Sequence, residues 1–428
     1  MPFAAHLDGC MKRKIMKSTQ DDISSFERAK LDPAFGDNGI LWLHAPDATQ
    51  TFAKGLSTTA DGSIFISLAC RFGQHAPDGV GIAKIGPDGE VDPDFGTQGY
   101  AIYPEKAARM TPFAPLILPN GDMLIRCLGG DAYKPMLMRI LADGSVDESF
   151  ADGGVQTFDL KDYRLIAADV VPMDDGRILV FGRATHKVIG STDGIVIRLL
   201  ENGQLDLSFH QTGMLSLSFR GDATTNASLG LLVDDKYLLA GGTETEALIR
   251  RYHLDGQIDT SFGVAGEYAL PSSDINTSWA AFNDLLVTPE GKLIGVGDQY
   301  LDRYSGFLVG LDANGHADPD FAEGKVLFTP PRLGTSTMSK LALDTSGRVV
   351  VYVDLSSEGF VLGRYSASGA LDETFGDRGY LYIGFGEARE LSLGFAIQGT
   401  RGILVSGQIV NTAPPMMNRA IIMRVPHA

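Results

Sequence analysis

The side chains with the clearest chemical potential are four cations and one tryptophan, each standing at or close to the start of an apolar run. These residues are Lys54, Arg109, Arg164, Trp279 and Arg389, and the threonines Thr225 and Thr335 hold the matching places in two further segments. Converging guanidinium and ammonium groups could hold an anion or an acidic peptide, and an indole could supply a stacking surface. The alternative is structural: the cations would be solvated loop charges paired with Glu105, Asp162 or Glu387, and Trp279 would fill a core.

Local signatures of catalysis are missing from the sequence. There is no GxxxxGK[ST] phosphate loop, no HExxH, no GxSxG and no paired CxxC. The eight histidines lie far apart and never at the spacing of metal ligands. We therefore predict no metal site and no cofactor. Whether the protein is an enzyme stays open, because residues distant in the sequence can still meet in one site.

The balance of charges argues against nucleic acid as a partner. Among 428 residues, Lys+Arg number 36 and Asp+Glu number 53, which gives a net charge of −17, and such a chain is repelled by phosphate backbones. No apolar run reaches the length of a membrane-spanning helix, and residues 1–22 lack the apolar core of a secretory signal. We therefore expect a cytoplasmic location, or export by a route that needs no such signal.

Three cysteines are too few for a disulfide framework. Cys70 and Cys127 each close an apolar run and are predicted to be small core residues.

One phrase with the pattern LDxxFGxxG occurs seven times and orders the whole chain. The seven copies begin at residues 31, 91, 146, 205, 258, 317 and 371, so the repeat spans 53 to 60 residues. Its aspartates are Asp32, Asp92, Asp147, Asp206, Asp259, Asp318 and Asp372. A period of this length is typical of repeat architectures in which each unit is one supersecondary element.

Other residues keep a fixed distance from the motif aspartate. A phenylalanine stands three positions after the aspartate in every copy. In six units a glycine, such as Gly89 or Gly203, stands three positions before the aspartate. Such Asp-Gly and Asn-Gly pairs indicate tight hairpins. Eight positions before the aspartate stands a cation: Lys84, Arg139, Arg198, Arg251, Arg364 or, in the final strand, Arg424. We expect each cation to pair with its motif aspartate as a structural clamp.

Two units depart from the pattern. Gly310 stands where the cation belongs, and the inner turn at Asp234-Asp235-Lys236 has no glycine. Local distortion is expected at both places.

Three strand-like runs lie between consecutive motifs, and a fourth follows each motif. Runs such as RILVFG and RVVVYV are apolar throughout, which indicates strands buried on both faces. Seven four-stranded units favour an all-β fold, a seven-bladed β-propeller with four antiparallel strands per blade, over a β-helix. The chain begins with a motif strand and ends one strand short of a unit. The N-terminal strand near 40–43 should therefore pair with the strand near 418–425 and complete the last blade.

The phrase LDxxFGxxG, with its upstream arginine and its Asp-Gly turn, resembles the delta-60 repeat family of bacterial propeller-like proteins. The resemblance covers about residues 31–425 and departs at Gly310 and at the turn of residues 234–236. It implies a propeller fold and, for many members, a cell-surface or exported setting, but no single chemistry.

These patterns predict one propeller domain over residues 31–428, preceded by a flexible extension over 1–30 that carries a small basic cluster. The leading hypothesis is a non-catalytic binding or scaffold module that recognises a protein, a peptide or a glycan. Its ligand would bind at the channel mouth or on the long loops that join the third and fourth strands of a unit counted from the motif. The alternative is a propeller hydrolase or lyase that acts on a sugar or a lactone at the central channel.

Overall fold

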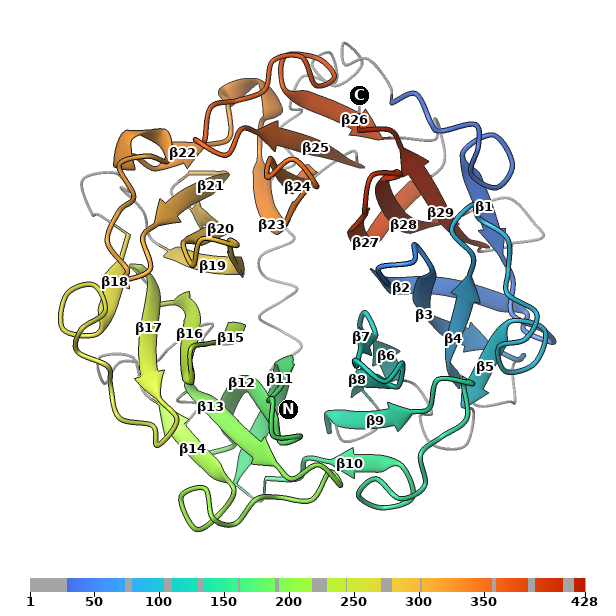
Figure 1. Cartoon of the computed structure of the whole chain (residues 1–428), viewed down its shortest axis with the longest axis horizontal. Coiled ribbons are helices and arrows are strands. Elements are labelled where there is room, and N and C mark those ends of the chain that lie inside the picture. Colours follow the sequence, from blue (N-terminus) through green and yellow to red (C-terminus); the bar gives the residue numbers. More distant parts are fainter. Residues whose placement is uncertain are drawn as a thin grey trace.

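The computed structural model describes residues 29–73, 79–103, 110–129, 134–160, 162–188, 192–217, 229–243, 245–270, 279–300, 302–355, 359–383, 389–410 and 419–427. Within them, seven antiparallel sheets stand around a central axis (Figure 1). The predicted seven-bladed β-propeller is therefore confirmed. The only helical segments among these residues are two short 3-10 turns, η2 (Ala322–Gly324) and η3 (Pro331–Leu333).

Each blade runs from an inner strand at the axis to an outer motif strand. Blade 1 consists of β2 (Gln50–Thr58), β3 (Ile64–Arg71), β4 (Gly79–Ile85) and β5 (Tyr100–Tyr103). Blade 2 consists of β6 (Met110–Pro112) with β7 (Leu116–Ile117), then β8 (Met123–Gly129), β9 (Met136–Ile140) and β10 (Val155–Thr157). Blade 3 consists of β11 (Tyr163–Pro172), β12 (Ile178–His186), β13 (Thr192–Leu199) and β14 (Met214–Leu217). The inner strand of blade 2 is interrupted between Pro112 and Leu116, where two prolines lack the N–H that a ladder needs.

Blades 4 to 7 complete the ring. They are β15 (Leu229–Val233), β16 (Lys236–Gly242), β17 (Ala247–His253) and β18 (Glu267–Ala269); β19 (Trp279–Val287), β20 (Leu293–Tyr300), β21 (Tyr304–Leu311) and β22 (Leu327–Phe328); β23 (Ser336–Leu343), β24 (Val349–Leu355), β25 (Gly359–Tyr365) and β26 (Tyr380–Ile383); and β27 (Arg389–Gln398), β28 (Gly402–Val410), β29 (Arg419–Val425) and β1 (Ile40–Leu43).

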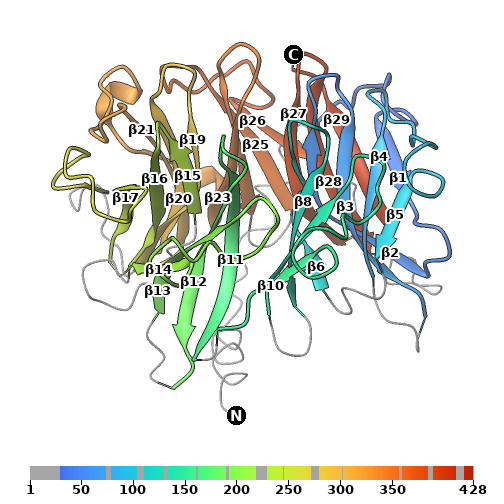
Figure 2. The same ribbon diagram turned by 60° about the horizontal axis from the view of Figure 1, so that its bottom comes forward.

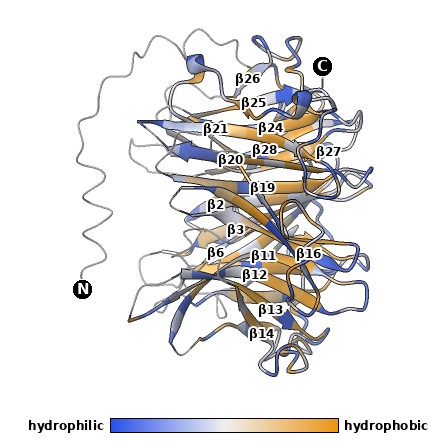
Figure 3. Cartoon of the chain, turned by 90° about the vertical axis from the view of Figure 1, so that its left-hand side faces the viewer, coloured by the Kyte–Doolittle hydropathy of each residue, from blue (hydrophilic) through white to orange (hydrophobic). Residues whose placement is uncertain are grey.

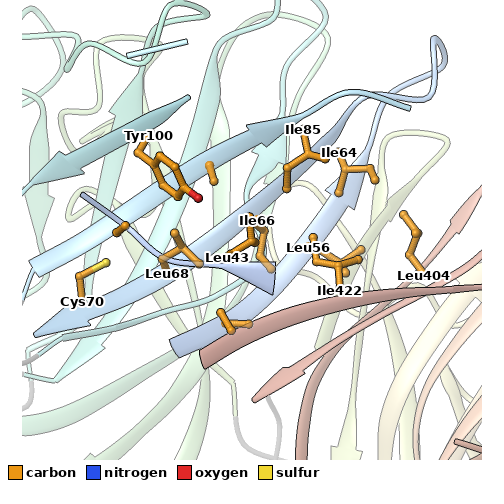
Figure 4. Close-up of a cluster of buried hydrophobic side chains, with 14 of the residues drawn as sticks. Leu43, Leu56, Ile64, Ile66, Leu68, Cys70, Ile85, Tyr100, Leu404 and Ile422 are labelled. Carbon is orange, nitrogen blue, oxygen red and sulfur yellow. The ribbon is translucent and has the colours of Figure 1, made fainter. Parts of the chain in front are cut away.

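The two ends of the described chain meet in blade 7, as the sequence predicts. β1 pairs antiparallel with β29, with Ile40 opposite Met423 and Leu43 opposite Ala420. Behind this closure, side chains of blades 7 and 1 form one buried cluster that includes Leu56, Leu404 and Ile422 (Figure 4). The closure leaves no unpaired edge strand at the seam of the ring.

Apolar side chains concentrate along the strands, inside the sheets and between them (Figure 3). β24 is buried along nearly its whole length, as its continuous run of valines predicts. Cys70 and Cys127 have no exposed surface, which confirms their assignment to the core.

The motif joins each blade to the next one. The predicted cation–aspartate pairs form at N–O distances of 2.7 to 3.3 Å: Lys84 with Asp92, Arg139 with Asp147, Arg198 with Asp206, Arg251 with Asp259, Arg364 with Asp372, and Arg424 with Asp32. We call each pair a motif clamp.

Four of the clamp guanidinium groups also lie 4.3 to 4.9 Å from the ring centroid of a motif phenylalanine: Phe209, Phe262, Phe375 and Phe35. In four clamps the Nη1 atom donates to a backbone carbonyl of a turn in the following blade: Arg139 to Glu201, Arg251 to Ala313, Arg364 to His427, and Arg424 to Pro87. The clamp therefore ties blades together and supplies acceptors to its guanidinium, except at Arg139, whose Nε has no hydrogen-bond partner among the described residues.

The hairpin glycines do more than allow tight turns, because they also leave space for a motif phenylalanine of the preceding blade. Gly203 has a φ of +81°, and a Cβ atom there would lie 2.6 Å from the ring of Phe150 in the preceding blade. The motif ring of one blade therefore packs on the bare backbone of the next. At the turn without glycine, Asp234 and Asp235 adopt φ values of +48° and +56° and close a two-residue hairpin, so the expected distortion is absent there.

Candidate binding site in the central channel

Irregularities in the inner strands turn polar side chains toward the axis. The strand register shifts by one residue between Ala53 and Gly55 in β2, Ala167 and Asp169 in β11, Phe282 and Asp284 in β19, Met338 and Lys340 in β23, and Ser392 and Gly394 in β27. Such β-bulges bend a strand and re-aim its side chains. Five blades thus interrupt an apolar inner strand at the same height.

Small residues let blades 7, 1 and 2 approach closely at this height. A Cβ atom on Gly55 would lie 2.5 Å from the backbone nitrogen of Ala114, and one on Gly394 would lie 3.2 Å from the Cα of Gly55. Blades 3, 5 and 6 instead carry Asp169, Asp284 and Lys340 at the equivalent positions. At this position of the inner strands, blades 3, 5 and 6 therefore contribute charged side chains, whereas blades 7, 1 and 2 contribute close backbone contacts.

A cavity of about 550 Å³ occupies the channel between these blades. Its polar lining consists of Lys54, Ser57, Arg126, Asp169, Asn283 and Lys340, and apolar side chains such as Phe113 and Phe395 complete the wall. A cavity of this volume, mostly apolar with a few convergent polar groups, has the character of a small-ligand site.

Arg126 is the cation held most firmly in the wall. Its guanidinium lies 4.1 Å from the ring centroid of Phe113, and its side chain is 17% exposed. Nη1 stands 3.8 Å from an oxygen of Asp169 and has no hydrogen-bond partner among the described residues. Burial lowers the pKa of Arg126, an effect that Asp169 opposes. Burial of a donor without an acceptor costs about 1–3 kcal/mol of folding free energy. A ligand atom that accepts a hydrogen bond from Nη1 would remove this cost.

Lys54 adds a second cation from blade 1. Its ammonium lies 5.8 Å from the ring of Phe52, and no described carboxylate forms an ion pair with it. Burial lowers the pKa of Lys54, and the nearby Arg71 lowers it further. An incoming anion would relieve both effects.

The two channel aspartates brace neighbouring blades. Asp169 accepts a hydrogen bond from the backbone N–H of Gly230 at 3.1 Å, and Asp284 accepts one from that of Leu341 at 3.0 Å. Asp284 also lies 3.7 Å from the ammonium of Lys340. Burial raises the pKa of Asp284, an effect that Lys340 and the backbone donors oppose. Both carboxylates line a second, smaller cavity of about 290 Å³.

Beside the bulges of blades 5 and 6 lies a layer of buried carboxyl groups. Asn283 donates to Asp298 and to the carbonyl of Met338, and Ser339 donates to Asp354. Burial, together with the charge of Asp354, raises the pKa of Asp298 to about 6, although the bond from Asn283 lowers it. Burial also raises the pKa of Asp354. The carboxyl groups of Asp298 and Asp354 stabilise the bulges through these hydrogen bonds and do not line the larger cavity.

Among the predicted site residues whose side chains the structure describes, Lys54 alone lines the cavity. Arg164 stands near the start of β11, paired in register with Thr185. Trp279 opens β19, and its ring meets that of Tyr304 edge to face at 6.2 Å. Arg389 opens β27 opposite Val410, and its side chain lies outside the described part. Arg109 lies outside the described residues altogether.

The residues that the sequence analysis missed are Arg126, Asp169, Asn283, Asp284 and Lys340. A usable signal was present, because AAFNDLLV and STMSKLAL interrupt an apolar strand with a polar pair at its centre. The predicted long-loop rim lies mostly outside the described residues. Within the described part, no three His, Cys, Asp or Glu side chains are grouped as metal ligands, and no helical segment has the length and apolar character needed to span a bilayer.

Comparison with known proteins supports the class and leaves the activity open. A family model described as a β-propeller domain of unknown function, DUF5122, matches residues 174–209 and 234–262. The chain is thus a β-propeller by sequence as well as by fold. No curated protein matches it.

Solved structures with a similar fold are distant in sequence. A Dyadobacter fermentans protein of unknown function is 11% identical, with 92% of this chain and 100% of that one covered and a TM-score of 0.42. A putative 6-phosphogluconolactonase from Bacteroides fragilis is 12% identical, with 77% and 84% covered and a TM-score of 0.43. A polysaccharide lyase of family PL25, an ulvan lyase, is 11% identical, with 94% and 95% covered and a TM-score of 0.48.

Proposed function

We propose that this propeller is a binding module whose central cavity accepts a carboxylate, carried by an acidic peptide or by an acidic glycan. The observation that carries the proposal is the buried Nη1 of Arg126, which has no hydrogen-bond partner among the described residues. Lys54 and Lys340 line the same cavity. On a chain of net charge −17, three cations and one carboxylate, Asp169, around one cavity give a local excess of positive charge that favours an anionic ligand.

The repeat array is the scaffold of this site. We propose that residues 31–428 act as one domain of the delta-60 repeat type, because seven copies of the motif stand in register. The clamps fix the blades relative to one another, which preorganises the cavity wall and lowers the entropic cost of binding.

Binding of oligoglutamate peptides and of oligogalacturonates, each measured by calorimetry beside an uncharged counterpart, tests the proposal. The proposal predicts that one acidic series binds and its neutral counterpart does not. Arg126→Met should weaken that binding at least tenfold, because it removes a charge-assisted hydrogen bond. Arg378→Met is the matched control, since Arg378 is 72% exposed and stands outside the cavity. Equal binding by both variants would refute the proposal, and so would the absence of binding by either acidic series.

A second candidate function, hydrolysis or elimination on a sugar or a lactone, is favoured by one observation. Asp169 and Asp284 line the same cavity of about 290 Å³, and burial raises the pKa of Asp284. Two carboxyl groups in one cavity, one of them with a raised pKa, are the kind of pair that can supply a general acid and its partner. Turnover of a lactone or glycoside that disappears in Asp284→Asn would establish this function. A substrate screen that finds no turnover would favour the binding module over the enzyme.

A further inference from the structure

The interface between blades 5 and 6 lacks one component of the motif clamp. Gly310 stands in β21 where the other units carry Lys or Arg, and among the described residues no guanidinium forms an ion pair with the motif aspartate of this unit, Asp318. A Cβ atom on Gly310 would lie 2.4 Å from the ring of Phe321, so that ring packs on the bare backbone. The distortion expected at this unit takes this form.

A cavity of about 260 Å³ remains at this place. Gly310, Asp318, Phe321 and Ala367 line it. In the preceding blade the corresponding groups hold Arg251: the carboxylate of Asp259 accepts from Nε, the ring of Phe262 lies 4.8 Å from the guanidinium, and the carbonyl of Ala313 accepts from Nη1. The cavity thus keeps an acid, an aromatic ring and a turn residue at the positions that surround a guanidinium elsewhere.

Lys292 supplies a charge at Asp318 but does not replace the missing guanidinium. Its ammonium lies 2.8 Å from Oδ2 of Asp318 and 3.2 Å from Oδ2 of Asp320. Blade 4 shows that such a lysine leaves room for a second cation, because Lys236 lies 2.8 Å and Arg251 2.7 Å from the same Oδ2 of Asp259. Arg348 and Arg364 share Asp372 in the same manner.

The turns whose residues line the cavity lie on the face of the ring that bears the C-terminal end of the chain, the upper side in Figure 2. Exposed Pro289, Glu290 and Asp320 stand at its rim, and the Asp320 side chain is 84% exposed. Three carboxylates, from Glu290, Asp318 and Asp320, face one ammonium, from Lys292, so the site carries a net negative charge. That charge attracts a cation from solution.

We propose that the cavity between blades 5 and 6 binds an alkylguanidinium group, such as the side chain of an arginine in a partner peptide or of a free arginine derivative. A planar guanidinium can stack on Phe321 while it donates to Asp318, whereas an ammonium repeats only what Lys292 already provides. This site is separate from the channel, so the proposal stands or falls independently of the carboxylate site.

Thermal unfolding of the full chain with millimolar ethylguanidinium tests the proposal, with ethylammonium and sodium chloride as matched salts. Ethylguanidinium should raise Tm saturably, by about 1–3 °C at ten times its Kd, and the two other salts should not. Agmatine and an arginine-containing peptide then distinguish a small-molecule source from a protein source. Equal effects of all three salts would overturn the proposal.

Substitutions assign the effect to this cavity. Asp318→Asn should abolish the response to ethylguanidinium, whereas Asp320→Asn, a substitution of the exposed neighbour, should retain it. Lys292→Met should bind at least tenfold more tightly, because the competing ammonium is removed from Asp318. Weaker folding cannot produce tighter binding, so this variant remains informative if Asp318→Asn folds poorly. An unchanged affinity in Lys292→Met, or a response that survives in Asp318→Asn, would contradict the assignment.

Discussion

Replacement of Asp298 by asparagine should stabilise the protein, and the gain should depend on pH. Asp298 is 4% exposed, and its pKa rises from 3.8 in the unfolded chain to about 6 in the fold. Between these pH values the folded chain retains a proton that the unfolded chain has lost. The free energy of unfolding therefore falls as pH rises through this window. At 1.36 kcal/mol per pH unit, the 2.2-unit difference amounts to at most about 3 kcal/mol above pH 6.

The Asp298→Asn variant carries no titratable group at this position, and its amide oxygen can still accept from Asn283. Its stability relative to the parent chain should rise from near zero at pH 3.5 to at most about 3 kcal/mol at pH 7.5. Urea unfolding followed by tryptophan fluorescence across this range measures the difference. Asp94→Asn, an exposed substitution in a motif loop, is the control and should show no such trend. A stability difference that is constant with pH, or a variant less stable than the parent at pH 7.5, would refute the reasoning.

Three further predictions concern the ring itself. Arg424→Met should cost about 3–5 kcal/mol in urea unfolding, because it leaves Asp32 without its partner and removes the bonds to Pro87 and Gln398; a loss below 1 kcal/mol would contradict the clamp. Gly203→Ala should destabilise the fold by about 1–3 kcal/mol more than Gly347→Ala, since both glycines have positive φ but only Gly203 faces a ring, and equal losses would exclude the packing argument. Leu41→Pro should expose the β1–β29 seam and raise hydrogen exchange in β29, because Leu41 pairs with Ile422; unchanged exchange would show that β1 is dispensable.

The fold could be predicted from the sequence because its defining features are local and repeated. The spacing of Asp32 to Asp372 sets the number of units, the hairpin glycines mark the turns, and the unmatched first motif requires closure at β1 and β29. The clamps could be predicted for the same reason, because five of them pair residues that lie eight positions apart in the sequence. The sixth, between Arg424 and Asp32, follows from the predicted closure of the ring.

The candidate site could be predicted only in part because β-bulges decide which side chains face the axis. A bulge inserts one residue and reverses the facing of those that follow. The polar pairs in AAFNDLLV and STMSKLAL mark two of these shifts, but the sequence does not show which side chain of each pair turns toward the axis. Arg126 lies on the second strand of its blade and reaches the cavity only because the inner strand breaks at residues 113–115. The ion pair of Lys292 with Asp318 could not be predicted without the pairing of β20 with β21, which sets Ile294 opposite Gly310.

We propose that the channel receives an anion at Arg126. A crystal structure of the full chain soaked in sodium bromide locates that anion, because the anomalous signal of bromide needs no assumption about the natural ligand. We expect a bromide peak in the channel cavity within hydrogen-bonding distance of Arg126 Nη1, and its loss in Arg126→Met. A channel that holds only water, with bromide bound elsewhere on the same molecule, would contradict it.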